Sequence, residues 1–153
     1  MNCNFCGILN TLESNETYIG DLEFGVLLLN VNQSFKGRCL YISKQHINLE
    51  NLENLESHLY LSCNKEILYV MKKLKILFNA ELVNLALLGN KEKHMHWHLI
   101  PRYRNDTNKN NPPWPNKEKI LNKDEFHSLI LLIKNNINRG EEIDREYSVP
   151  SIS

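Results

Sequence analysis

Stretches in which apolar side chains alternate with polar ones, or form short continuous runs, predict five strands in this chain. Glycines 20 and 25 bracket the connection between the first two stretches, which indicates a hairpin. The third has a clear period of two, because Leu40 and Ile42 alternate with Cys39, Tyr41 and Ser43. The predicted strands are residues 18–21, 24–31, 39–43, 82–88 and 93–103.

Between Gly37 and Gly89 lies a long stretch without glycine or proline, in which apolar residues recur every three to four positions. Its apolar side chains form one stripe, and lysines and a glutamate take the other side, which predicts a helix over about residues 55–78. The stripe consists of Ile67, Val70, Met71, Leu74, Leu77 and Phe78. A second stripe predicts a helix that begins with Asp124 as its N-cap and ends at Gly140.

Strands before and after two helices, joined by hairpin-length connections, are typical of an α+β domain with an antiparallel sheet. The chain has 153 residues, enough for one hydrophobic core without disulfide or metal support. We therefore expect a single domain over residues 1–140 and a polar C-terminal tail over residues 141–153. Residues 12–17 and 104–117 are expected to be loops.

The charge balance argues against two classes of partner. Lys plus Arg and Asp plus Glu both number 18, whereas a nucleic-acid or membrane surface would show a basic excess. The chain contains no apolar run of 18 residues, so no membrane-spanning helix is expected. The first residues lack the basic and apolar regions of a signal peptide, and we expect a cytoplasmic protein with free thiols.

Three of the six histidines lie two residues apart, at positions 94, 96 and 98. A strand sends alternate side chains to opposite faces, so the three imidazoles share one face and Met95, Trp97 and Leu99 share the other. On a helix the same histidines would scatter. We expect the apolar face to be buried and the imidazole face to stay available for chemistry.

Three interpretations of the histidines remain open from the residues alone. The first interpretation is that the histidines are an incidental feature of a polar strand face. The second is a metal site, since imidazole is the commonest metal ligand. The third interpretation is chemistry on a phosphate, in which one neutral imidazole attacks and others stabilise charge.

The seven residues 94–100 match the pattern His-φ-His-φ-His-φ-φ, where φ is apolar, at every position. The chain thereby resembles the histidine triad (HIT) family of nucleotide hydrolases and transferases. Further similarity, to the diadenosine polyphosphate hydrolase-like branch, lies in residues 87–90, 101–103, 106 and 112–115. The resemblance covers roughly residues 3–137. It implies a HIT-like fold, with a five-stranded antiparallel sheet, one long helix and a C-terminal helix, and it implies a homodimer.

The resemblance also implies a mechanism. His96 would attack the α-phosphorus of a nucleotide and form a nucleotidyl-histidine intermediate, which water then hydrolyses. His98 would donate to phosphate oxygens or protonate the leaving group, and His94 would orient its neighbour or bind phosphate. The implied substrates are dinucleoside polyphosphates or similar conjugates, and the chemical step requires no cofactor. A phosphoramidate hydrolase, a nucleotidyl transferase and a non-catalytic nucleotide-binding module are the alternatives.

Weaker correspondences assign three nucleotide-binding residues. Asn30 matches a position that contacts the ribose, and Asn90 matches polar residues near the phosphates, although both are also ordinary turn asparagines. Arg38 stands where several relatives have a fourth histidine, and its guanidinium can engage phosphate. Trp114 would shape the pocket or cap the neighbouring subunit, unless it only packs on the surface.

Cys3 and Cys6 form a Cys-x-x-Cys motif, which suggests zinc or redox chemistry. A structural zinc needs four ligands. The resemblance implies the missing two, because some bacterial members complete such a site with histidines at positions that correspond to His46 and His94. A structural zinc on these four residues is therefore possible; the alternative is a pair of simple buried thiols. Cys39 and Cys63 are expected to be core thiols.

Overall fold

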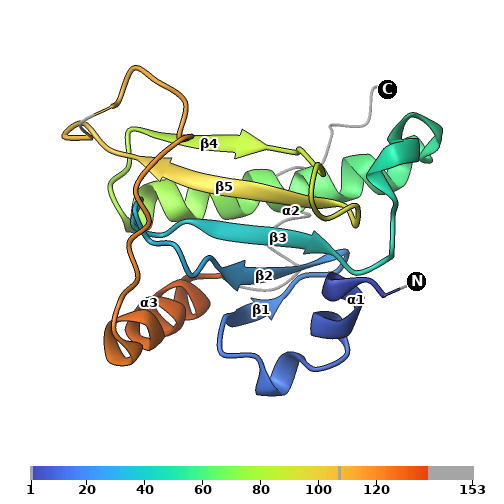
Figure 1. The fold of residues 1–153 in the computed structure, drawn as a ribbon, viewed down its shortest axis with the longest axis horizontal. Coiled ribbons are helices and arrows are strands. Elements are labelled where there is room, and N and C mark those ends of the chain that lie inside the picture. Colours follow the sequence, from blue (N-terminus) through green and yellow to red (C-terminus); the bar gives the residue numbers. More distant parts are fainter. Residues whose placement is uncertain (1, 107, 138–153) are drawn as a thin grey trace, which may run out of the picture.

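The computed structural model describes residues 2–106 and 108–137 and has an α+β fold (Figure 1). Its five strands form one antiparallel sheet, as the sequence and the resemblance predict, and their order in the sheet is β1-β2-β3-β5-β4. The strands are β1 (Tyr18–Asp21), β2 (Gly25–Leu29), β3 (Cys39–Ser43), β4 (Leu82–Ala86) and β5 (His96–Arg102). The helices are α1 (Asn4–Leu9), α2 (Ser57–Leu77) and α3 (Lys123–Asn136), with the 3₁₀ turns η1 (Leu12–Ser14) and η2 (Leu49–Asn54).

The main core lies between one face of the sheet and the helices α2 and α3. Apolar side chains recur on these helices at helical spacing and on β2, β3 and β5 at every second position, so both sets meet in one layer. Its central members include Leu27, Tyr41, Ile67, Val70, Leu74, Trp97, Leu99, Ile130 and Ile133. Figure 1 shows α2 running behind the sheet, along the strands. The opposite face of the sheet is therefore left for α1 and the loops.

A smaller cluster covers part of that opposite face. Phe5 of α1 packs there against Val26 and Leu28 of β2 and Ile42 of β3. Because α1 covers this side, β3 is buried on both faces, with only Leu40 half-exposed, rather than half-buried as its alternating pattern indicates. The N-terminal helix thus closes a second layer beside the histidines.

Several predicted boundaries are wrong by a few residues. Residues 1–16 contain the helix α1 and the turn η1, where the sequence analysis expected no element. The N-cap of α3 is Asn122, whose Oδ1 accepts from the backbone N–H of Glu125 at 2.9 Å. Asp124 lies instead in the first turn, where the helix dipole favours a carboxylate.

The ends of the other elements also differ. The helix α3 ends at Asn136, before Gly140, which lies with the predicted tail 141–153 outside the described residues. The strand β5 begins at His96, and His94 makes only an isolated bridge with Asn48. Within the part of the chain that is described, no helix is both long and apolar enough to cross a membrane.

Candidate active site

The strand β5 divides its side chains between the two faces of the sheet as predicted. Met95, Trp97 and Leu99 are buried in the main core under α2, while His96 and His98 point to the face that α1 partly covers. The imidazole face is more covered than the strand pattern alone indicates, although His96 and His98 both line a pocket. His94 and His96 are only 1% and 6% exposed. Phe5 of α1 packs on His94 and His96, and Trp114 of the loop after β5 packs on His98.

A hydrogen bond fixes the tautomer of His96. Its Nδ1 lies 2.7 Å from the backbone carbonyl oxygen of His94. Because a carbonyl oxygen only accepts, Nδ1 carries a proton and donates, and in the neutral imidazole the lone pair is therefore on Nε2. The ring of Phe5 packs against that of His96 with centroids 4.8 Å apart. The imidazole is thus held in one orientation with an unprotonated nitrogen available.

His98 lies in a cationic and aromatic environment. Its ring centroid is 5.4 Å from that of His96 and 5.3 Å from that of Trp114. Burial lowers the pKa of His98 to about 4, with further contributions from His96 and Arg38. His98 is therefore neutral at pH 7, and its buried Nδ1 has no hydrogen-bond partner among the described residues.

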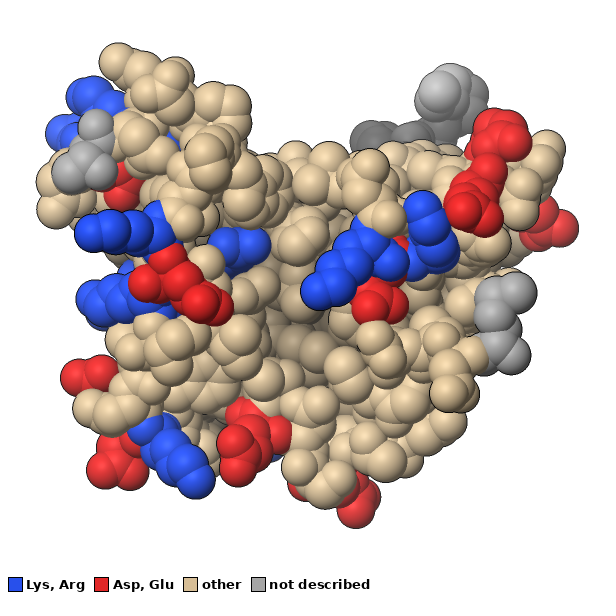
Figure 2. All heavy atoms as spheres, in the orientation of Figure 1, with Lys and Arg blue, Asp and Glu red and all other residues tan. Residues whose placement is uncertain are grey.

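A pocket of about 290 Å³ lies over the two histidines. Its size is at the lower end of the range for small-molecule sites. Figure 2 shows the face of the molecule hollowed near its middle, with Lys and Arg side chains on either side. The pocket is lined by Phe5, Leu40, Leu88, Gly89, Asn90, Lys91, Glu92, His96 and His98.

The structure brings two of the three predicted nucleotide-binding residues to the histidines. Asn90 lines the pocket, and the Arg38 guanidinium contributes to the environment of His98. Asn30 does not line the pocket; its Oδ1 accepts from the backbone N–H of Asn32 at 2.9 Å, as in an ordinary asparagine turn. The role of Asn30 at a ribose stays a prediction.

Sequence reasoning missed two residues that shape the site. Phe5 forms a wall of the pocket, and only its position inside the Cys-x-x-Cys motif could have drawn attention to it. Arg102 holds the loop that carries Trp114, because its buried guanidinium donates to Asp106, to Asn84 and to backbone carbonyls of Asn108 and Asn111. This anchoring places Trp114 against His98.

The four predicted metal ligands lie together beside the triad. The ligand atoms of Cys3, Cys6, His46 and His94 are all within 4.8 Å of one another. The Cys3 sulfur is 3.4 Å and the Cys6 sulfur 3.6 Å from Nδ1 of His94. Two sulfurs and two imidazole nitrogens are a typical zinc ligand set.

The environment of His94 favours its use as a ligand. Its Nε2 lies 2.7 Å from the carbonyl oxygen of Ser43 and must donate to it, which leaves the lone pair of Nδ1 directed at the two sulfurs. The residues present therefore fit a zinc ion. The other two cysteines are buried free thiols, as predicted, and burial raises the pKa of Cys63 to about 11.

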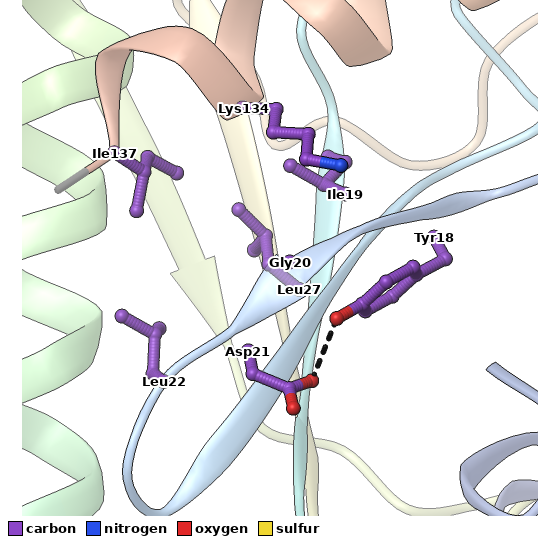
Figure 3. A pocket seen from close by; sticks show the side chains of 8 residues that line it. All are labelled: Tyr18, Ile19, Gly20, Asp21, Leu22, Leu27, Lys134 and Ile137. Carbon is purple, nitrogen blue, oxygen red and sulfur yellow. Dashed lines mark hydrogen bonds between the residues drawn. The ribbon is translucent and has the colours of Figure 1, made fainter. Parts of the chain in front are cut away.

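A separate hollow of about 160 Å³ lies at the far edge of the sheet, between β1 and the end of α3 (Figure 3). The hydroxyl of Tyr18 donates there to Oδ1 of Asp21 at 3.0 Å. None of the histidines or cysteines described above lines this hollow. It is not part of the candidate active site.

An antiparallel sheet with three histidines at alternate positions, two on β5 and one just before it, is the arrangement of a histidine triad protein. Residues 11–105 match the HIT domain, and the chain belongs to this family. An uncharacterized HIT-like protein of Borreliella burgdorferi is 31% identical over 110 residues, which are 68% of this chain and 78% of that protein. A second uncharacterized HIT-like protein, from Methanocaldococcus jannaschii, is 29% identical over 106 residues, 68% of this chain and 81% of the other.

Solved structures share the fold at lower sequence identity. A histidine triad protein from Bradyrhizobium japonicum has a TM-score of 0.71 and 22% identity, covering 79% of this chain and 90% of its own. A zinc-bound histidine triad family protein from Mycobacterium smegmatis has a TM-score of 0.69 and 17% identity, covering 89% of this chain and 93% of its own. The diadenosine triphosphate hydrolase of Plasmodium falciparum has a TM-score of 0.63 and 19% identity, covering 82% of this chain and 78% of its own. The assignment to the diadenosine polyphosphate hydrolase-like branch stays a prediction.

Proposed function

We propose that this protein is a nucleotide phosphohydrolase that acts on dinucleoside polyphosphates or similar nucleotide conjugates. The observation that carries the proposal is the fixed imidazole of His96, whose Nδ1 donates to the His94 carbonyl, so that the neutral ring has its lone pair on Nε2 beside the pocket. The fold shared with a diadenosine triphosphate hydrolase supports the same activity. An oriented neutral imidazole is what nucleophilic attack on phosphorus requires.

The proposed reaction has two displacements. Nε2 of His96 attacks the α-phosphorus, a P–N bond forms, and the P–O bond to the leaving group breaks with its electron pair on the departing oxygen. Water then attacks the same phosphorus and loses a proton to the solvent, the P–N bond breaks with its electron pair returning to Nε2, and a nucleoside monophosphate leaves. The imidazole gains positive charge in the first step, and the His94 carbonyl stabilises it through Nδ1.

We also propose that zinc binds to Cys3, Cys6, His46 and His94 as a structural ion, and that the protein works in the cytoplasm. Reducing conditions there keep both cysteines available as ligands. The ion supplies a cross-link between α1 and the residues before β5, and it takes no part in the chemical step. The His94 side chain then binds the metal, and the His94 backbone carbonyl accepts the hydrogen bond from His96.

Hydrolysis of three adenine nucleotides by the purified protein tests the proposed function. We expect diadenosine tetraphosphate, diadenosine triphosphate or adenosine phosphoramidate to release adenosine monophosphate. Quenching at high pH, where a phosphorus–imidazole bond survives, should trap an adenylyl group on the peptide that contains His96. Tight binding of all three compounds without any release of adenosine monophosphate would contradict the proposal and favour a nucleotide-binding module.

We further propose a homodimer formed through α2 and β4. Leu61, Leu68 and Ile76 lie on the outer side of α2 and are 48–70% exposed. The edge strand β4 adds two exposed leucines, Leu82 and Leu85, and has one unpaired edge. These exposed apolar side chains are distinct from the stripe that α2 buries in its own core.

A charge on this stripe is expected to separate the subunits. Sedimentation of the unmodified protein should give twice the chain mass of 18.0 kDa, and the Leu68→Glu variant should give the single-chain mass. The matched control is Leu131→Glu, a similarly exposed position on α3. A single-chain mass for the unmodified protein over a broad concentration range would refute the dimer.

A further inference from the structure

Arg38 is a buried cation without a counter-ion. The residue is 6% exposed, and no carboxylate among the described residues pairs with its guanidinium. Its Nε is buried and has no hydrogen-bond partner in the described part of the chain. A buried charge in this condition is costly unless a ligand compensates it.

The second buried arginine shows what a structural guanidinium looks like in this fold. Arg102, at 4% exposure, donates to a carboxylate, to a side-chain amide and to two backbone carbonyls. Among the described residues, the Arg38 side chain has none of these contacts and stacks on Trp114, with 5.5 Å from its guanidinium carbon to the ring centroid. The contrast indicates that the partner of Arg38 is a bound molecule.

The position of Arg38 identifies which part of a substrate it meets. The register of β3 against β5 pairs Ile42 with His96 and Leu40 with His98, and Arg38 is two residues further along the same face. Phe5 packs on His96 at one end of this row, and Trp114 packs on His98 at the other. Relative to His96, the row therefore has an apolar end beside Phe5 and a cationic end beside Trp114.

We infer that Arg38, stacked on Trp114 beside His98, binds the leaving group and selects substrates in which that group is a phosphate chain over those in which it is an amine. The inference rests on the proposed function and names the substrate class for the same site. Arginine is well suited to phosphate because its planar guanidinium donates two parallel hydrogen bonds to it. Nε of Arg38 and Nδ1 of His98 are the two buried side-chain polar atoms without a hydrogen-bond partner in the described part of the chain.

The chemistry of bond breaking supports this selection. When the P–O bond to a phosphate chain breaks, the electron pair stays on the leaving oxygen, and a nearby cation stabilises that charge directly. An amine leaves only after a proton reaches its nitrogen, and His98, neutral at pH 7 partly because of Arg38, is a poor donor of that proton. The cation therefore favours one leaving group and disfavours the other.

Two substrates that transfer the same adenylyl group to His96 test the inference. We expect Arg38→Gln to lower kcat/KM for diadenosine tetraphosphate by about 10- to 100-fold, the range for one lost charged hydrogen-bonding group. The value for adenosine phosphoramidate should change less than about threefold. Arg38→Lys should restore part of the tetraphosphate activity. The matched control is Arg104→Gln, an exposed position outside the pocket, which should change neither value.

Two outcomes overturn the inference, and each differs from failure of the proposed function. Equal losses for both substrates would mean that Arg38 acts on the transferred phosphate or on the structure. If the unmodified protein hydrolyses neither substrate, the proposed function fails, and calorimetric binding of inorganic tripolyphosphate then decides about Arg38. Tripolyphosphate binding that is at least about tenfold weaker in Arg38→Gln and partly restored in Arg38→Lys supports the subsite. Binding that is unchanged in both variants refutes it.

Discussion

Replacing His96 by alanine is expected to lower kcat for the hydrolysed nucleotide by at least about 10³-fold, as found when an essential nucleophile is removed. The loss follows because Nε2 of His96 forms the proposed bond to phosphorus, and alanine has no nucleophilic side-chain atom to replace it. His96 makes one hydrogen bond, to a backbone carbonyl, so the sheet should survive its removal. Steady-state release of adenosine monophosphate, with circular dichroism on the same samples, measures both effects.

A second histidine variant separates this effect from a general one. His127 lies exposed on α3, outside the pocket, and His127→Ala should retain full activity. Free imidazole should restore part of the activity of His96→Ala by occupying the space next to Phe5, and should not affect His127→Ala. Near-normal turnover by His96→Ala would overturn the assignment of the nucleophile.

The parts of the fold that the sequence predicts correctly are those with a long or regular pattern. Six apolar positions at helical spacing place α2 within two residues of its observed start, and β3 has the predicted ends. The shared face of His96 and His98 follows from the period of a strand, which allows no other arrangement once β5 is assigned. These inferences depend on local geometry, which the sequence determines directly.

The parts that it does not predict depend on contacts between distant segments. The helix α1 has six residues, too few for a stable helix in isolation, and it is held by packing of Phe5 against β2 and β3. The same packing covers His96, so the burial of this imidazole depends on α1, which the local pattern does not predict. No pattern within residues 94–100 indicates what lies above them.

The unpaired state of Arg38 is a further property that only the three-dimensional environment shows. In the sequence, Arg38 and Arg102 are both arginines next to apolar strands, and only the family resemblance distinguishes Arg38. Hydrogen bonds from Arg102 to residues six and nine positions later make it structural, while Arg38 meets an aromatic ring and no acceptor. A function assigned to either residue therefore requires the coordinates.

Removal of both N-terminal cysteines is expected to abolish zinc binding and to lower the melting temperature. One zinc per chain should be present in the unmodified protein and absent from the Cys3→Ser, Cys6→Ser variant, by elemental analysis. With free zinc at about 1,000 times its dissociation constant, binding adds about 4 kcal/mol to the free energy of unfolding. For a chain of this length that corresponds to roughly 8–16 °C in melting temperature.

Loss of the metal should also disturb His96, because the two sites share His94. The His94 side chain faces the sulfurs of Cys3 and Cys6, and its carbonyl holds Nδ1 of His96. The double variant should therefore show lower kcat as well as lower stability, whereas His127→Ala should keep its zinc. Cobalt added in place of zinc should give a thiolate absorption band in the unmodified protein and none in the double variant. A metal-free protein whose melting temperature does not rise on addition of zinc would refute the site.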